Sequence, residues 1–173
     1  CLPRSHNKHN NFNQLNRKGT NMVRLEHANL VVTEIQPTLD FLLTAFPSWR
    51  IRGKGQGVWG NAQRNWLHVG DDDYYLTLND NGQGEIRDLA GANPGLAHLG
   101  FVVDELEPLM NRLTQKGYKV DIIGRDHPHR NTAYFIDPAG FQFEFMQYTS
   151  NQPDEKNQYG GEHGELKRAS PTT

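Results

Sequence analysis

The middle of the chain alternates apolar and polar residues in short runs that are typical of half-buried strands. The clearest run is "FQFEFMQ" at residues 141–147, in which Phe143 and Phe145 flank Glu144. Neighbouring residues of a strand point to opposite faces of a sheet, so we expect Glu144 to face away from the core that its neighbours enter. The same kind of pattern predicts further strands at residues 49–54, 64–70, 73–79, 118–123 and 132–137.

This pattern occurs twice along the chain. The stretch "LEHANLVVTEIQPTLDFL" (25–42) aligns without a gap with "LAHLGFVVDELEPLMNRL" (96–113), and His27 matches His98 in that alignment. Each stretch begins with alternating residues and continues into an amphipathic helix. An internal repeat of this kind indicates that one supersecondary unit has been duplicated.

The repeat defines the expected fold. Pro37 and Pro108 lie near the first turn of the two helices, where a missing N–H costs little. Three strands follow each helix, which predicts an α+β fold of two tandem βαβββ modules, module one at residues 24–80 and module two at residues 95–148. One helix covers only one face of each small sheet, so the other face must line a cavity or meet a partner.

The duplication also identifies four equivalent positions on the faces turned away from the helices. They are His27 and His98 on the first strands, and Thr77 and Glu144 on the last strands. Two imidazoles and one carboxylate suit a divalent metal such as Fe, Mn, Zn, Ni or Co, with coordination positions left for water or substrate. Such a metal would also compensate a carboxylate placed among aromatic residues, whose burial alone is costly. A hydrogen-bonded structural role is the alternative for a single strand histidine.

The two ends of the chain differ from its middle. Residues 1–21 and 149–173 are polar and aperiodic, and we expect both to be flexible. We expect Met22 to be the natural start, which would make residues 1–21 a disordered or non-native extension before a domain at residues 22–148.

Composition excludes some classes of function. The 18 Lys and Arg residues against 20 Asp and Glu residues give a net charge of −2 in 173 residues, which predicts no nucleic-acid or anionic membrane partner. No apolar run approaches the roughly 20 residues that a membrane span requires. The single cysteine, Cys1, fits a reducing compartment, and we expect a cytoplasmic protein.

Residues 24–148 resemble the vicinal oxygen chelate superfamily, which includes glyoxalases, bleomycin-resistance proteins and extradiol dioxygenases. The resemblance is carried by "LEHANLVV", "LAHLGFVVDELEPL" and, most specifically, "YFIDPAGFQFEF". It implies a cupped, barrel-like mixed sheet with the helices outside and a divalent metal inside. The family's metal ligands match His27, His98 and Glu144, and Glu144 would double as a catalytic base.

The resemblance implies a metal-dependent enzyme that acts on a small oxygen-bearing substrate, with glyoxalase-type lyase or isomerase chemistry favoured. An Fe(II) or Mn(II) dioxygenase and a non-enzymatic, antibiotic-sequestering protein are the alternatives. Thr77 departs from glyoxalase I, which usually has Glu there; Thr77 would bind weakly, hold a water molecule or leave a position open. Resembling proteins of this length usually pair, so we expect a homodimer. Its sites lie either within one chain or between His27 of one chain and His98 with Glu144 of the other.

Further residues are candidates for substrate contact, with plain packing or solvent exposure as the alternative for each. They are Tyr75, Asn79, Tyr134 and Gln142 on the cavity faces, and Arg125 and Arg130 as an anion clamp in the loop "GRDHPHRNT". His68 is either a rim residue or a surface residue. The glycine-rich segment 50–64 is expected to form a mobile hairpin loop or lid with Trp59 at its tip.

Overall fold

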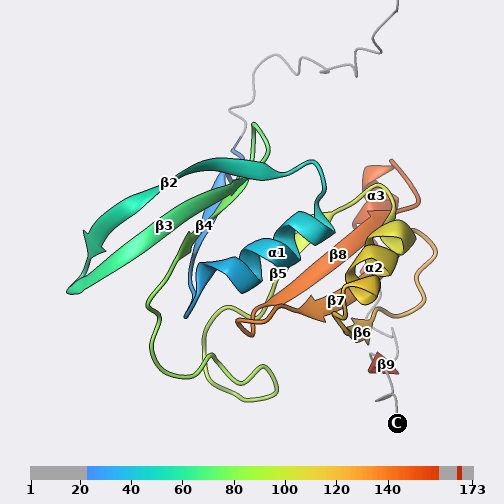
Figure 1. Cartoon of the computed structure of the whole chain (residues 1–173). Helices are drawn as coiled ribbons and strands as arrows, with labels where there is room; N and C mark the ends of the chain where they lie inside the picture. The colour runs from blue at the N-terminus through green and yellow to red at the C-terminus, as the bar shows by residue number, and fades with distance from the viewer. Residues whose placement is uncertain (1–22, 160–166, 169–173) are drawn as a thin grey trace, which may run out of the picture.

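The computed structural model describes residues 23–159 and 167–168, which form two βαβββ modules (Figure 1). Module one comprises β1 (His27–Val31), α1 (Ile35–Ala45), β2 (Arg50–Trp59), β3 (Ala62–Gly70) and β4 (Tyr75–Asn79). Module two comprises β5 (Leu99–Val102), α2 (Leu106–Gln115), β6 (Val120–Ile123), β7 (Arg130–Ile136) and β8 (Gln142–Tyr148). The expected α+β fold and the duplicated element order are confirmed.

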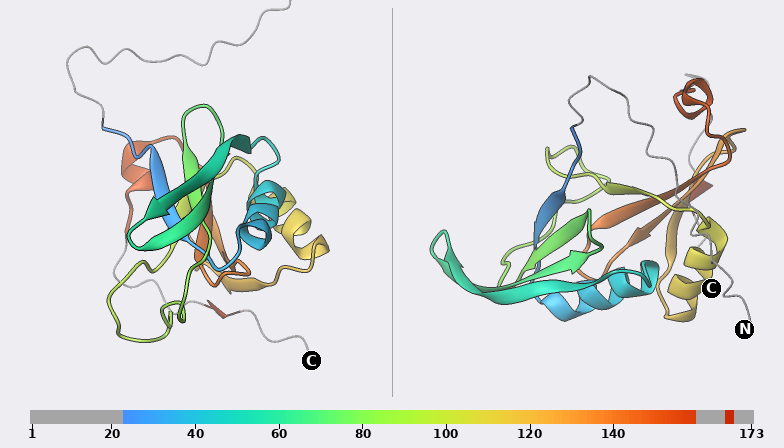
Figure 2. Two further views of the ribbon diagram at one scale, coloured as in Figure 1. Left: turned by 60° about the vertical axis from the view of Figure 1, so that its left-hand side comes forward. Right: turned by 90° about the horizontal axis from the view of Figure 1, so that it is seen from above.

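Each module contributes a separate mixed sheet. The first sheet has the order β1-β4-β3-β2 and the second β5-β8-β7-β6, extended by the two-residue strand β9 (Lys167–Arg168). In both sheets the first strand is parallel to the last strand of its module, and the other pairs between module strands are antiparallel. The sheets are not closed into a barrel, so the barrel-like part of the expectation does not describe this single chain (Figures 1 and 2).

One hydrophobic core serves both modules. Phe41 of α1 is fully buried and packs against Phe143 and Phe145 of β8, with ring centroids 5.2 and 6.4 Å away. A helix from module one therefore contacts the sheet of module two. The aromatic side of "FQFEFMQ" faces this shared core, as the alternation predicted, and that placement leaves Glu144 on the other face of β8.

A side chain of α2 caps the C-terminal end of α1. Arg112 of α2 donates from Nε to the backbone oxygen of Thr44 and from Nη2 to that of Ala45, at 3.2 and 3.0 Å. These carbonyls end α1, where backbone acceptors have no partner within the helix and the helix dipole favours a cation. Helix α2 itself ends before Gly117, whose φ of +89° suits glycine.

Strands β2 and β3 form a long hairpin that extends away from the rest of the module (Figures 1 and 2). The segment 50–64 is a hairpin with Trp59 at its tip, as expected, but the expectation of a loop was wrong: β2 is paired strand up to Trp59, the turn lies at Gly60, and β3 begins at Ala62. The glycines of β2 have a packing role. A Cβ on Gly55 would lie 2.6 Å from the Trp66 ring, so only glycine leaves room for that indole.

The ends of the chain add little to this fold. The N-terminal segment 1–21 and Met22 lie outside the described residues. In the C-terminal segment, where we expected flexibility, Pro153–Lys156 forms the short helix α3. Among the described residues, no helix is both long and apolar enough to cross a membrane.

Candidate metal and substrate site

His98 and Glu144 are brought together on the open face of the second sheet. His98 directly precedes β5, and Glu144 lies in the middle of β8, paired with Gly100. Nε2 of His98 is 3.1 Å from Oε2 of Glu144, and the glutamate side chain is only 13% exposed. Because β5 and β8 are neighbouring parallel strands, the duplicated pattern was sufficient to place both side chains on one face.

Tyr134 holds the other oxygen of the same carboxylate. Its hydroxyl donates to Oε1 of Glu144 at 2.7 Å from the neighbouring strand β7. Burial first, and the bond to Glu144 second, raise the pKa of Tyr134 well above its usual value, so the phenol remains a proton donor at neutral pH. Glu144 is therefore oriented with Oε1 on Tyr134 and Oε2 towards His98.

His27 lies in the other module, on the edge strand β1. Its ring stacks on Tyr75 with the centroids 4.8 Å apart and the planes 14° from parallel, and its Nδ1 lies 2.9 Å from Oε2 of Glu26. The imidazole is exposed and is not part of the His98–Glu144 pair. The structure thus places two of the three expected ligands together and the third elsewhere.

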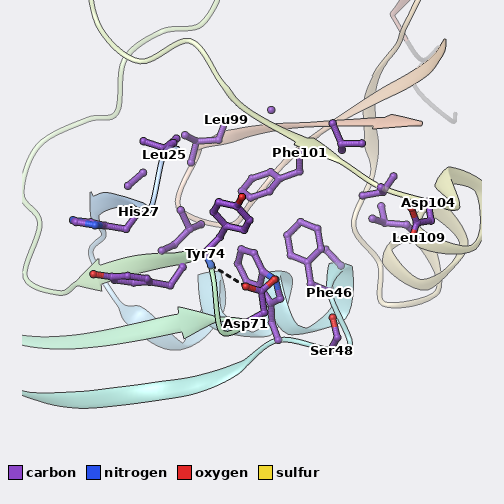
Figure 3. Close-up of a pocket in the computed structure, with 18 of the residues that line it drawn as sticks. Leu25, His27, Phe46, Ser48, Asp71, Tyr74, Leu99, Phe101, Asp104 and Leu109 are labelled. Atoms are coloured by element: carbon purple, nitrogen blue, oxygen red, sulfur yellow. Dashed lines mark hydrogen bonds between the residues drawn. The ribbon is translucent and has the colours of Figure 1, made fainter. Parts of the chain in front are cut away.

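A groove between the two sheets borders both histidines. It has a volume of about 1060 Å³, and we call it the inter-sheet groove. Figure 3 shows His27 at one end of this groove, with Phe46 and Phe101 pointing into its middle. Glu144 does not line this groove.

The donor set beside Glu144 matches the ligands of a divalent metal in part. His98 and Glu144 offer an imidazole nitrogen and a carboxylate oxygen side by side, which are ordinary ligands of divalent transition metals. Within residues 23–159 and 167–168, however, no group of three His, Cys, Asp or Glu side chains is arranged to hold a metal ion. The pair therefore provides two of the three expected ligand side chains, and the described residues of this chain place no third one beside them.

Thr77 and Asn79 are less accessible than expected. Both are only 7% exposed, although they lie on the same face of β4 as Tyr75. Nδ2 of Asn79 donates to Oδ1 of Asn29 at 2.7 Å across the β1–β4 pair. Asn79 is thus engaged in a cross-strand bond, and Thr77 is covered by its neighbours.

The open face of the first sheet carries a row of rings, of which Trp66 was not among the residues expected from the sequence. Trp66, His68, Tyr75 and His27 follow one another with centroid distances of 4.8–4.9 Å, and the Arg52 guanidinium lies 4.4 Å from the Tyr75 ring centre. Burial lowers the pKa of His68, and the charges of Arg52 and His27 lower it further. The alternation in "RNWLHVG" was the available signal, because it sends Trp66 and His68 to one face.

The remaining candidates surround a second cavity beside Glu144. This cavity of about 500 Å³ is bordered by Arg125, Arg130, Tyr134 and Glu144, and we call it the Arg130 pocket. Gln142 lies outside it and donates to Oδ2 of Asp121 at 2.6 Å. Four of the expected site residues therefore meet around one pocket, whereas Tyr75 and Asn79 belong to the other module.

Solved structures share this fold at low sequence identity. A glyoxalase/bleomycin resistance protein/dioxygenase domain from Frankia sp. EAN1pec is 21% identical, with a TM-score of 0.61 over 74% of this chain and 99% of that one. The genomically encoded fosfomycin resistance protein FosX from Listeria monocytogenes, complexed with Mn(II) and sulfate, is 16% identical, with a TM-score of 0.55 over 79% and 99% of the two chains.

A glyoxalase family protein from Bacillus cereus is 13% identical, with a TM-score of 0.61 over 77% of this chain and 99% of that one. No curated protein sequence was found to match. The sequence profile of the Glyoxalase/Bleomycin resistance protein/Dioxygenase superfamily matches residues 24–145, which span both modules. The chain therefore belongs to the glyoxalase, bleomycin resistance protein and dioxygenase superfamily, the group also known as the vicinal oxygen chelate superfamily.

Proposed function

We propose that this protein is a divalent-metal-dependent enzyme that acts on a small oxygen-bearing substrate. The observation that carries the proposal is the arrangement of Glu144, whose two oxygens are directed at His98 and Tyr134. A carboxylate that is 13% exposed and bonded in this way is held in a defined orientation, as a ligand or base requires.

Each residue has a distinct role in this proposal. His98 and Glu144 would hold the metal, which, when bound, supplies positive charge that stabilises negative charge developing on substrate oxygens. Tyr134 keeps Glu144 in place through its hydroxyl. Glu144 would take a proton from a substrate carbon next to the substrate oxygens and return it to another position of the substrate, which is an isomerase or lyase type of proton transfer.

We further propose that the third ligand is His27 of the partner subunit in a homodimer. The described residues of one chain hold no cluster of three ligand side chains, and His27 is exposed on an edge strand. Apolar residues near the same edges are also exposed, Leu25 at 75% and Val102 at 69%. A second chain that covers this surface would bury them and bring an imidazole to His98 and Glu144.

Two other functions remain for the same scaffold. A dioxygenase would use the same three ligands with Fe(II) or Mn(II) and would consume O₂. A sequestering protein would use the ring row on the first sheet, formed by Trp66, His68, Tyr75 and His27, to stack a planar ligand. The specific position of Glu144 favours the enzyme, because stacking alone does not require an oriented carboxylate.

Metal analysis tests the proposal most directly. Protein purified without chelator should contain about one equivalent of a divalent metal per chain, and H98A and E144Q should each lose most of it. Lys119 is exposed and is not a proposed metal ligand, so K119Q should keep the metal content of the wild type. Less than roughly a tenth of an equivalent in the wild type, unchanged by H98A, would contradict a metalloenzyme.

Mixing two defective chains tests the partner ligand. H27A and H98A should each bind little metal alone. If the site is shared, a mixed dimer rebuilds one complete site from His98 of the H27A chain and His27 of the H98A chain. If every site lies within one chain, co-refolding the two variants restores no metal binding, and the shared site is excluded.

A further inference from the structure

The Arg130 pocket has the composition of an anion-binding site. Arg125 and Arg130 both border it, and neither makes an ion pair with a carboxylate within the part of the chain that the structure describes. The Glu144 carboxylate borders the same pocket but is engaged by His98 and Tyr134. Two guanidinium groups are therefore available beside the proposed catalytic carboxylate.

Tyr159 of the C-terminal segment forms part of the pocket wall. The ring of Tyr159 lies under the Arg130 guanidinium, 4.8 Å from it, and borders the pocket. Nε2 of His127 is 2.9 Å from the backbone oxygen of Gln158, which ties the segment to the loop before β7. The cation–π contact occupies a face of the guanidinium and leaves its N–H edge for a ligand.

Charge and size restrict what the pocket accepts. Asp126 also borders the pocket and is exposed, so its carboxylate reduces the positive field without pairing with either arginine. A volume of about 500 Å³ lies within the range of small-molecule sites. Guanidinium groups recognise planar carboxylates and phosphoryl groups through paired charge-assisted hydrogen bonds.

We propose that the Arg130 pocket binds a carboxylate or phosphoryl group of the substrate, with Arg125 and Arg130 as its ligands. This inference rests on the proposed function, because it places the anionic end of the substrate next to Glu144. In this arrangement the reacting oxygens of the substrate lie near His98 and Glu144, and the anionic group of the substrate lies towards Tyr159. Arg125 and Arg130 thus determine which substrates bind, whereas the proton transfer belongs to Glu144.

Titration of chelator-treated protein with inorganic phosphate, and separately with acetate, tests this inference. Amide and arginine Nε–H chemical shifts followed by NMR should report binding of at least one of the two anions, in the range of roughly 1–10 mM. The affected resonances should include those of Arg125, Arg130 and Tyr159. The anion that binds more tightly shows whether the pocket prefers a phosphoryl group or a carboxylate.

Substitutions localise the binding. R125Q and R130Q should each weaken binding of that anion by about tenfold, and the double variant should abolish it. K119Q changes the net charge equally, but Lys119 does not border the pocket, so its affinity should stay within about twofold of the wild type. Arg125 is exposed, so R125Q remains informative even if R130Q fails to fold.

Two results would overturn the inference. One is the absence of binding by both anions, and the other is wild-type affinity in R125Q and in the double variant. The titration uses metal-free protein, so a failure here contradicts the anion pocket alone. A failure of metal binding in untreated protein, with anion binding intact, contradicts the proposed function and leaves the anion site itself in place.

Discussion

Oγ1 of Thr38 in α1 donates to Oδ2 of Asp137, which directly follows β7, at a distance of 2.5 Å. Thr38 is fully buried and Asp137 is 3% exposed, and they belong to different modules. The other carboxylate oxygen accepts from the backbone N–H of Phe141 at 2.7 Å, within the turn that leads into β8. The Thr38–Asp137 hydrogen bond therefore connects helix α1 to the turn before β8, the strand that carries Glu144.

We expect T38V to destabilise the protein by about 2 kcal/mol, because it removes a donor from a buried carboxylate. Thr44 provides a matched control in the same helix, since among the described residues its hydroxyl bonds only to the backbone oxygen of Asp40. T44V should change the free energy of unfolding by less than about 0.5 kcal/mol. Urea unfolding at pH 7 measures both, and equal effects would remove the special role of Thr38.

Asp137 should also make stability depend on pH. Burial raises its pKa above the usual 3.8, although bonds from Thr38 and from the Phe141 backbone act in the opposite direction. The folded state then holds this proton more tightly than the unfolded state does, and the associated stability is fully present below pH 3.8. It is lost as the pH rises through the folded-state pKa.

D137N cannot lose that proton, so its stability relative to the wild type should rise over the same pH window and then stay level towards neutrality. Unfolding free energies of both proteins between pH 3.5 and 7 provide the comparison. A difference that is constant, or that falls with pH, would show that burial does not raise the pKa of Asp137.

Y134F should weaken metal binding by roughly 10- to 100-fold, because Glu144 loses the donor that orients it. Tyr118 lies in the core beside Phe41, and its hydroxyl makes no hydrogen bond among the described residues, so Y118F is the control. Titration calorimetry with Zn(II) or Mn(II) on chelator-treated protein gives both affinities. Equal affinities for Y134F and the wild type would mean that Tyr134 does not position Glu144.

Two glycines of β2 allow a matched test of the hairpin. In G55A the new methyl group meets the Trp66 ring at 2.6 Å, and the expected cost is about 1–3 kcal/mol. A methyl group on Gly57 meets nothing within 4 Å, so G57A should be neutral or up to about 1 kcal/mol stabilising. Thermal unfolding followed by tryptophan fluorescence distinguishes the two, and similar stabilities would contradict the close packing of Trp66 on β2.

The sequence was sufficient wherever a short-range pattern sets which face a side chain occupies. Alternation put Phe143 and Phe145 in the core and Glu144 on the open face, and the duplication put His98 on the same kind of face. The parallel pairing of β5 with β8, which makes the two side chains neighbours, came from the structure. The same reasoning applied to "RNWLHVG" would have placed Trp66 beside His68. The start of β2 was predicted at residues 49–54, but its glycine-rich continuation to Trp59 was misjudged, because that strand conformation depends on pairing with β3 and on packing under Trp66.

By itself, the sequence determined the two βαβββ modules, the faces of their strands and the identity of the polar residues on them, because these follow from local periodicity and repetition. Only the tertiary structure decided how the modules are arranged. Contacts between distant residues, such as Arg112 with Ala45 and Thr38 with Asp137, fix that arrangement, and no local pattern encodes them. That arrangement separates His27 from the His98–Glu144 pair.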